Sequence, residues 1–152
     1  MAANTNPIYS LTPNIGETKI TQSSALVRSD GGATNAIGTD HFLAFTAGAN
    51  GSFVQRVRFI PVASAAAVNS VATTLRVFIS SVNTGIPTPT NTMLLAEISV
   101  PIISASNSTA AVSYYEIPLN IAIPNGNYIL VSQHIAQTAN QSWQAMVFGG
   151  DY

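Results

Sequence analysis

Hydrophobic and polar residues alternate with a period of two along most of this chain, which is the pattern of strands that bury one face. β-Branched and aromatic residues fill the alternating runs, as half-buried strands prefer. The alternation predicts eight strands, at 17–28 (interrupted near Ser23), 41–47, 52–62, 72–81, 92–103, 112–119, 127–135 and 142–148.

The same alternation assigns side chains to shared faces of the strands. The predicted sets are Phe53, Gln55, Val57 and Phe59 opposite Arg56 and Arg58; Leu75, Val77 and Ile79 opposite Thr74, Arg76 and Phe78; Leu94, Ala96, Ile98 and Val100 opposite Glu97; and Tyr115, Ile117 and Leu119 opposite Tyr114 and Glu116. Arginines and glutamates are thus expected together on outer faces, where they can form cross-strand ion pairs.

Turn signals separate the predicted strands. Asp30-Gly31-Gly32 and Gly48-Ala49-Asn50-Gly51 supply positions with positive φ, and Pro124-Asn125-Gly126 predicts a tight turn. A longer loop is expected from Asn83 to Asn91, where two prolines keep the backbone extended. The stretch from Ala63 to Val71 is rich in alanine but short, so we expect a loop or a single turn there.

The elements together predict the fold class. Residues 1–16 contain Pro7, Pro13 and Gly16 among asparagines and threonines, which favours an extended N-terminal arm. Residues 17–152 are expected to form a single domain, because the length suits one domain and is short for two. About eight strands with almost no helix predict an all-β antiparallel sandwich, with jelly-roll topology as the first expectation and an immunoglobulin-like Greek key as the alternative.

Composition indicates a surface that is partly covered. Only 7% of the residues are charged and the net charge is −1, whereas about 25% are charged in an average soluble domain. Serine, threonine, asparagine and glutamine fill the polar positions, and such side chains can be buried in an interface at modest cost when they are hydrogen-bonded. We therefore expect neighbouring subunits to cover part of the molecule; a low-charge monomer is the alternative.

Charge and hydropathy also bear on partners and location. Five basic residues provide little for nucleic acid, which needs a basic patch. No apolar run approaches the roughly 20 residues of a membrane-spanning helix, and the first residues lack the basic and apolar regions of a secretory signal. The expectation is a protein made in the cytoplasm of its host, without nucleic acid or membrane as a partner.

Few residues are candidates for catalysis. The chain has no cysteine and two histidines; His41, beside Asp40, opens a predicted strand and His134 lies near the end of another, so both are expected at the rim or surface. Neither a serine-nucleophile motif nor a metal-ligand spacing is present. Glu97 and Glu116 would suit glycoside hydrolysis only if they faced each other across a cleft. We expect no enzymatic activity, no metal and no cofactor.

Arginine and aromatic residues are the candidates for binding. Arg56, Arg58 and Arg76 are predicted interface residues, because arginine forms oriented, bidentate hydrogen bonds to carboxylates. A sugar-binding platform is the alternative role for the aromatic residues, although most alternate in step with the strands and suit core or interface positions: Tyr114, Tyr115, Tyr128, Trp143 and Phe148.

Several segments together resemble a group of small proteins of tailed bacteriophages and prophages: TNPIYSLTPNIGETKIT (5–21), FTAGANGSFVQRVRF (45–59), RVFIS (76–80), IPLNIAIPNGNYILV (117–131) and FGGDY (148–152). Members with a proposed role resemble capsid decoration, or cement, proteins or other virion-surface proteins, and the stretch from Val27 to Thr39 departs from their pattern. The resemblance implies a virion protein on the capsid surface, often a homotrimer, whose partner is the major capsid protein and which has no catalytic residues.

The resulting hypothesis is a decoration protein that binds the outside of a phage head and stabilises it. Its candidate interface residues are Pro7, Ile8, Tyr9 and Leu11 of the arm, with Arg56, Arg58 and Arg76. The alternatives are a phage tail or fibre module that binds a host-surface glycan, and a glycan hydrolase.

Overall fold

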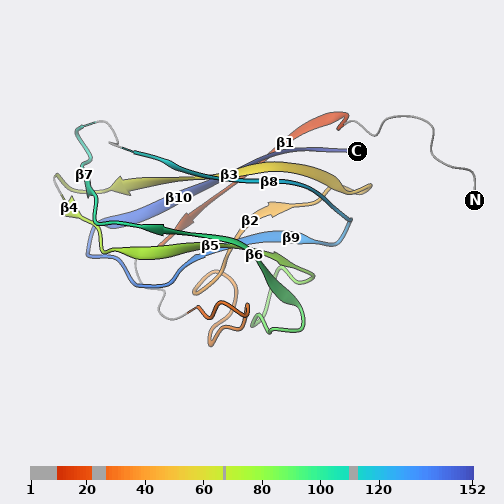
Figure 1. The fold of residues 1–152 in the computed structure, drawn as a ribbon, viewed down its shortest axis with the longest axis horizontal. Helices are drawn as coiled ribbons and strands as arrows, with labels where there is room; N and C mark the ends of the chain where they lie inside the picture. The colour runs from red at the N-terminus through yellow and green to blue at the C-terminus, as the bar shows by residue number, and fades with distance from the viewer. Residues whose placement is uncertain (1–9, 22–26, 67, 110–112) are drawn as a thin grey trace, which may run out of the picture.

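The computed structural model describes residues 10–21, 27–66, 68–109 and 113–152. This part of the chain contains ten strands and no helix, and two four-stranded sheets lie face to face (Figure 1). The predicted all-β antiparallel sandwich is confirmed.

Every strand pairing in the two sheets is antiparallel. Sheet A has the order β1 (Thr12–Ile20), β10 (Gln141–Asp151), β3 (Ser52–Ala63) and β8 (Tyr115–Ile123). Sheet B has the order β2 (Phe42–Thr46), β9 (Tyr128–Gln133), β5 (Thr73–Ser80) and β6 (Thr92–Val100). A third, two-stranded ladder joins β4 (Val68–Asn69) to β7 (Ser104–Ala105) at one end of the sandwich (Figure 1).

All eight predicted strand regions contain a strand, but several boundaries differ. β1 begins at Thr12, so residues 12–16, expected in the arm, form the first half of an edge strand. β8 continues to Ile123, and the predicted tight turn follows it: the backbone N of Asn127 donates to the carbonyl of Pro124 at 3.3 Å. The strands β4 and β7 were not predicted, because two residues are too few to show an alternation.

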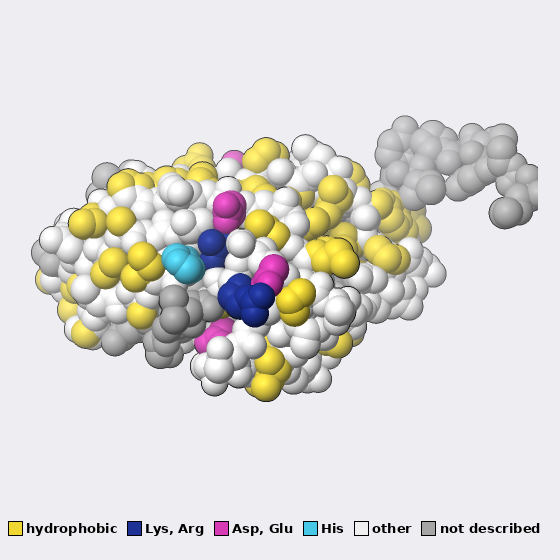
Figure 2. Space-filling view, turned by 60° about the horizontal axis from the view of Figure 1, so that its bottom comes forward, with side chains coloured by type: hydrophobic (Ala, Val, Ile, Leu, Met, Phe, Trp, Pro, Cys, Tyr) yellow, Lys and Arg dark blue, Asp and Glu magenta, His cyan; other side chains and the backbone are white. Residues whose placement is uncertain are grey.

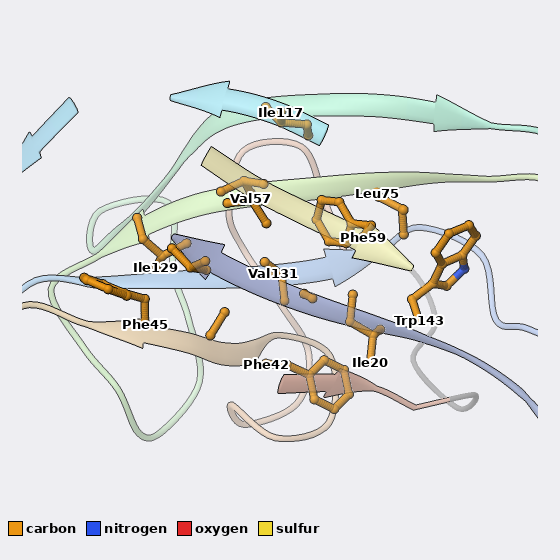
Figure 3. Packing of buried hydrophobic residues seen from close by; sticks show 14 of the residues in the cluster. Ile20, Phe42, Phe45, Val57, Phe59, Leu75, Ile117, Ile129, Val131 and Trp143 are labelled. Carbon is orange, nitrogen blue, oxygen red and sulfur yellow. The ribbon is translucent and has the colours of Figure 1, made fainter. Parts of the chain in front are cut away.

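The hydrophobic core lies between the sheets (Figure 3). Phe59 of β3 has no exposed surface, and Trp143 of β10 is only 1% exposed. Leu75 of β5 and Val131 of β9 meet them from sheet B and are fully buried. Burial of apolar surface contributes roughly 25 cal/mol per Å², so this cluster is the main stabilising feature of the domain.

A bulge in β3 changes one predicted face. In the pairing of β10 with β3, Gly149 faces Val54 and Phe148 faces Arg56, so Gln55 is an extra residue of β3, and an extra residue in one strand reverses the alternation beyond it. Val54 is therefore fully buried and Gln55 is exposed. The prediction that Phe53 and Gln55 share the face of Val57 is wrong for this reason.

The outer face of sheet B is covered as well. The segment 27–39 lies over it, and a second hydrophobic cluster forms between them from Val27, Phe78 and Leu130, with Ile37, Leu43, Leu94 and Tyr128 packed against it. Leu95 is an extra residue of β6 opposite Val77 and Phe78 of β5, and this bulge turns Leu94 into the cluster. The prediction that Leu94 shares a face with Ala96 is therefore wrong, and β5 is buried on both sides.

Candidate functional site

The outward side chains of sheet A form a continuous surface, which we call the outer face of sheet A. Trp143, Ala145 and Val147 of β10 are buried in the core, so their neighbours along the strand point outward. By the cross-strand register, the face comprises Ile15, Glu17 and Lys19 of β1; Gln144, Met146 and Phe148 of β10; Arg56, Arg58 and Ile60 of β3; Glu116 and Pro118 of β8; and Tyr114, just before β8.

An arginine–aromatic cluster occupies the half of this face formed by β10, β3 and β8. The guanidinium carbon of Arg56 lies 4.6 Å from the ring centroid of Phe148, its register partner. The guanidinium carbon of Arg58 lies 4.6 Å from the Tyr114 ring and 5.3 Å from the Phe148 ring. Such cation–π contacts contribute about 0.5–1 kcal/mol each at exposed sites, and here they orient both guanidinium groups.

Glu116 pairs with both arginines. Its Oε1 lies 2.6 Å from Nη2 and 2.7 Å from Nε of Arg58, and 3.3 Å from Nε of Arg56. The predicted cross-strand ion pairs are thus confirmed. The three side chains are 30–32% exposed, so each pair contributes no more than about 1 kcal/mol. Two cations share one carboxylate oxygen, which leaves an excess of positive charge in the cluster.

A hollow of about 320 Å³ lies beside the cluster, between β1 and β10. Its lining is Glu17, Thr18, Lys19, Gln144, Ala145 and Met146. Glu17 and Lys19 form no ion pair with any described residue. Ile15 on β1 and Tyr114 beside β8 stand out from opposite edges of this face, at 58% and 59% exposure.

Arg76 lies on the opposite side of the molecule, on the outer side of sheet B. Its side chain is buried: Nε donates to Glu97 Oε2 at 2.9 Å, and Nη1 donates to the carbonyl of Val27 at 2.6 Å and to Nδ1 of His134 at 3.2 Å. Arg76 therefore fastens the segment 27–39 to sheet B instead of standing free for a partner. Figure 2 shows that side, where charged side chains gather in one small group between hydrophobic patches.

Of the two histidines, both expected at the rim or surface, His134 is half-buried and His41 lies elsewhere. His41, expected at the rim, is fully buried with its ring edge-on to Phe78 at 4.8 Å between centroids. Burial lowers its pKa to about 4, although the charge of Asp40 opposes this change. Neither ring nitrogen has a hydrogen-bond partner among the described residues. His41 is therefore a neutral, covered side chain.

The two glutamates considered for glycoside hydrolysis do not face each other. Glu97 pairs with Arg76 on the outer side of sheet B, and Glu116 pairs with Arg58 on the outer side of sheet A. Both sheets of the sandwich lie between them. This arrangement offers no cleft in which one carboxyl could protonate a leaving group while the other attacks.

Among the predicted arm residues, Pro7, Ile8 and Tyr9 lie outside the described residues. Leu11 directly precedes β1, is 83% exposed, and its backbone N donates to the carbonyl of Asp151 at 2.7 Å. The structure therefore brings Leu11, Arg56 and Arg58 to one sheet and places Arg76 on the other.

Comparison of the chain with protein-family models, with curated proteins and with solved structures finds no match. Within the described ranges, no group of three or more histidine, cysteine or acidic side chains could hold a metal ion. No helix long and apolar enough to cross a membrane occurs in the part of the chain that the structure describes.

Sequence reasoning did not predict which residues lie beside the two arginines on this face, above all Met146 next to Arg58 and Phe148 next to Arg56. The alternation in 142–148 already places Met146 and Phe148 on the side opposite Trp143. It does not say that β10 pairs with β3, and only that pairing sets Phe148 beside Arg56.

Proposed function

We propose that this protein is a non-catalytic structural subunit that binds other protein subunits through the outer face of sheet A. The arginine–aromatic cluster carries the proposal. Aromatic residues, methionine and arginine are enriched in protein interfaces, and tyrosine and arginine are frequent among the residues that dominate binding energy. This face combines Phe148, Tyr114, Met146 and two arginines in one contiguous surface.

The assembly that suits this subunit best is the head of a tailed phage, with the chain acting as a decoration protein on the outside of the shell. The support is the resemblance of the sequence segments to phage virion proteins and the low charge content. In this proposal the major capsid protein is the partner, copies of the chain associate with each other, and the arm from Pro7 to Leu11 adds a contact to the shell.

We also infer that the sandwich is a jelly roll. Each sheet alternates strands from the early and late parts of the chain, in the orders β1-β10-β3-β8 and β2-β9-β5-β6, as expected for eight strands folded into two Greek keys. Viral capsid and lectin domains both use this architecture. The topology therefore suits a virion subunit and a glycan-binding module equally. The two functions differ in the side chains that they need on the surface.

The cluster favours a protein partner over a glycan. A sugar ring stacks on an exposed aromatic face, but guanidinium groups already lie over the rings of Phe148 and Tyr114. Trp143 is 1% exposed, with Tyr115 edge-on to it at 6.0 Å between centroids. Neither ring is available as a platform.

Binding to phage heads tests the proposal. Heads of the phage that encodes the chain, assembled without it, should co-sediment with the purified protein. Replacing both Arg56 and Arg58 by alanine should weaken that binding at least tenfold, and so should deletion of residues 2–10, which leaves β1 intact. Arg28→Ala is the control, because Arg28 is an exposed arginine outside sheet A.

Circular dichroism would verify that each variant is folded. A wild-type chain that does not sediment with heads would overturn the decoration role. Undiminished binding by the double arginine variant would overturn the role of the outer face.

A further inference from the structure

The outer face of sheet A also has the features of a surface that complements itself. We infer that two copies of the chain pack through this face about a two-fold axis that runs parallel to the strands, between β10 and β3. The inference rests on the proposed function, since it names the subunit that covers the proposed binding face.

The size of the face is appropriate for such a contact. Four strands about 4.8 Å apart and nine residues of about 3.4 Å each, from Leu11 to Lys19, give a projected area of roughly 600 Å². Side-chain relief raises the accessible area above this projection, and a standard interface buries about 800 Å² per partner. One sheet face is therefore sufficient for a stable dimer.

The outer face of sheet A has a protruding side chain, Tyr114, and a hollow that can receive it in a second copy. With the axis between the two central strands, β1 of one copy lies opposite β8 of the other, and residues at the same level along the strands face each other. Lys19 and Gln144, which line the hollow, share a level with Ile60 and Tyr114. The exposed ring of Tyr114 in one copy then enters the hollow between β1 and β10 of the other.

The charges also complement each other in this arrangement. Arg56 and Arg58 share the single carboxylate of Glu116, while Glu17 has no ion pair among the described residues. Glu17 and Glu116 lie at the same level on the two edge strands. The second copy therefore places Glu17 opposite Glu116 and one strand away from Arg58, so that two carboxylates and two guanidinium groups share one cluster, and it places Lys19 opposite Tyr114. An isologous contact brings the same patch of both subunits together, and this patch carries charges of both signs.

Sedimentation velocity over a range of concentrations tests the inference directly. The wild-type protein should form a dimer with a dissociation constant at or below about 10 µM. Tyr114→Ala removes the protruding ring and should weaken the dimer at least tenfold. Ile15→Asp should do the same, because it places an unpaired charge in the contact.

Met93→Asp is the matched control for Ile15→Asp. Met93 lies on β6, the edge strand of the other sheet, and is 60% exposed compared with 58% for Ile15. This control should dimerise like the wild type. Equal weakening by the two aspartate variants would overturn the inference, and so would a wild-type monomer at about 100 µM or a trimer that Tyr114→Ala leaves intact.

The head-binding experiment separates this inference from the proposed function. A monomer that still binds phage heads would overturn the dimer and leave the decoration role standing. A dimer that does not bind phage heads would overturn the decoration role but not the inference that the outer face of sheet A binds a second copy.

Discussion

At Gly16 the backbone of β1 passes directly against the backbone of β2. A Cβ atom at this position would lie 1.9 Å from the carbonyl oxygen of Ala44 and 2.9 Å from the Cα of Phe45. Both obstacles are backbone atoms, so no side-chain rotation can relieve the clash. Glycine is thus required where the edge strands of the two sheets meet.

Gly16→Ala should destabilise the domain by about 3 kcal/mol, because the two edge strands must separate to admit the methyl group. Urea unfolding monitored by tryptophan fluorescence measures the loss, since Trp143 is the single tryptophan and lies in the core. Thr18→Ala, two residues further along β1, is the control. A Gly16→Ala variant as stable as this control would contradict the close approach.

The buried ring of His41 makes stability depend on pH. Burial lowers its pKa from 6.5 to about 4, so on acidification the unfolded chain takes up the proton first. Stability is then complete above about pH 6.5 and falls as the pH drops toward 4, by up to about 3 kcal/mol.

His41→Gln should remove most of this loss, because glutamine does not titrate. The free energy of unfolding, measured in urea at pH 7 and at pH 4.5, should fall less in the variant than in the wild type. His134→Gln, which changes the half-buried histidine beside Arg76, is the comparison. An equal loss of stability in the wild type and in His41→Gln would show that another group is responsible.

At the scale of elements, the segment 27–39 covers the outer face of sheet B, and a small number of hydrogen bonds hold it there. Arg76 holds the carbonyl of Val27, and Asp40 accepts a hydrogen bond from the backbone N of Asn35 at 2.9 Å. Two backbone hydrogen bonds join the segment to the loop before β6, from Ala33 N to the carbonyl of Pro87 and from Ile37 N to the carbonyl of Gly85. The cover therefore depends on few contacts besides the small hydrophobic cluster beneath it.

Arg76→Met should loosen this cover while keeping the apolar part of the side chain. Loss of the hydrogen bonds to Val27 and Glu97 should cost about 2 kcal/mol, and hydrogen exchange should accelerate in 27–39 but not in β3. Arg28→Met is the control, because its ion pair with Asp30 is exposed and contributes little. If Arg76→Met left the protection of 27–39 from hydrogen exchange unchanged, Arg76 would not be what holds this segment on sheet B.

The strands themselves could be predicted from the sequence because a period of two is a local property. Val57, Phe59, Leu75 and Ile117 are buried as the alternation indicates. The bulge at Gln55 could not be predicted, since hydrophobic period alone does not show where one strand carries an extra residue. The outer face of sheet A required the pairing of β10 with β3, which joins residues about 90 positions apart and depends on the tertiary fold.

At the scale of the whole molecule, most charged side chains form ion pairs or hydrogen bonds with other residues of the same chain. The chain has five basic and six acidic residues, and within the described ranges four ion pairs engage seven of them. Asp40 and Asp151 accept hydrogen bonds from Asn35 and Asn14. Glu17 and Lys19 are left, and both lie on the outer face of sheet A. Few charges thus remain to keep copies of the protein apart.

The most direct test of this account is an electron-microscopy reconstruction of an intact particle that contains the protein. We expect density for the sandwich on the outside of the shell, with the outer face of sheet A covered by another polypeptide around Arg58, Tyr114 and Phe148. A reconstruction in which that face points into solvent, with no second chain against it, would contradict the account.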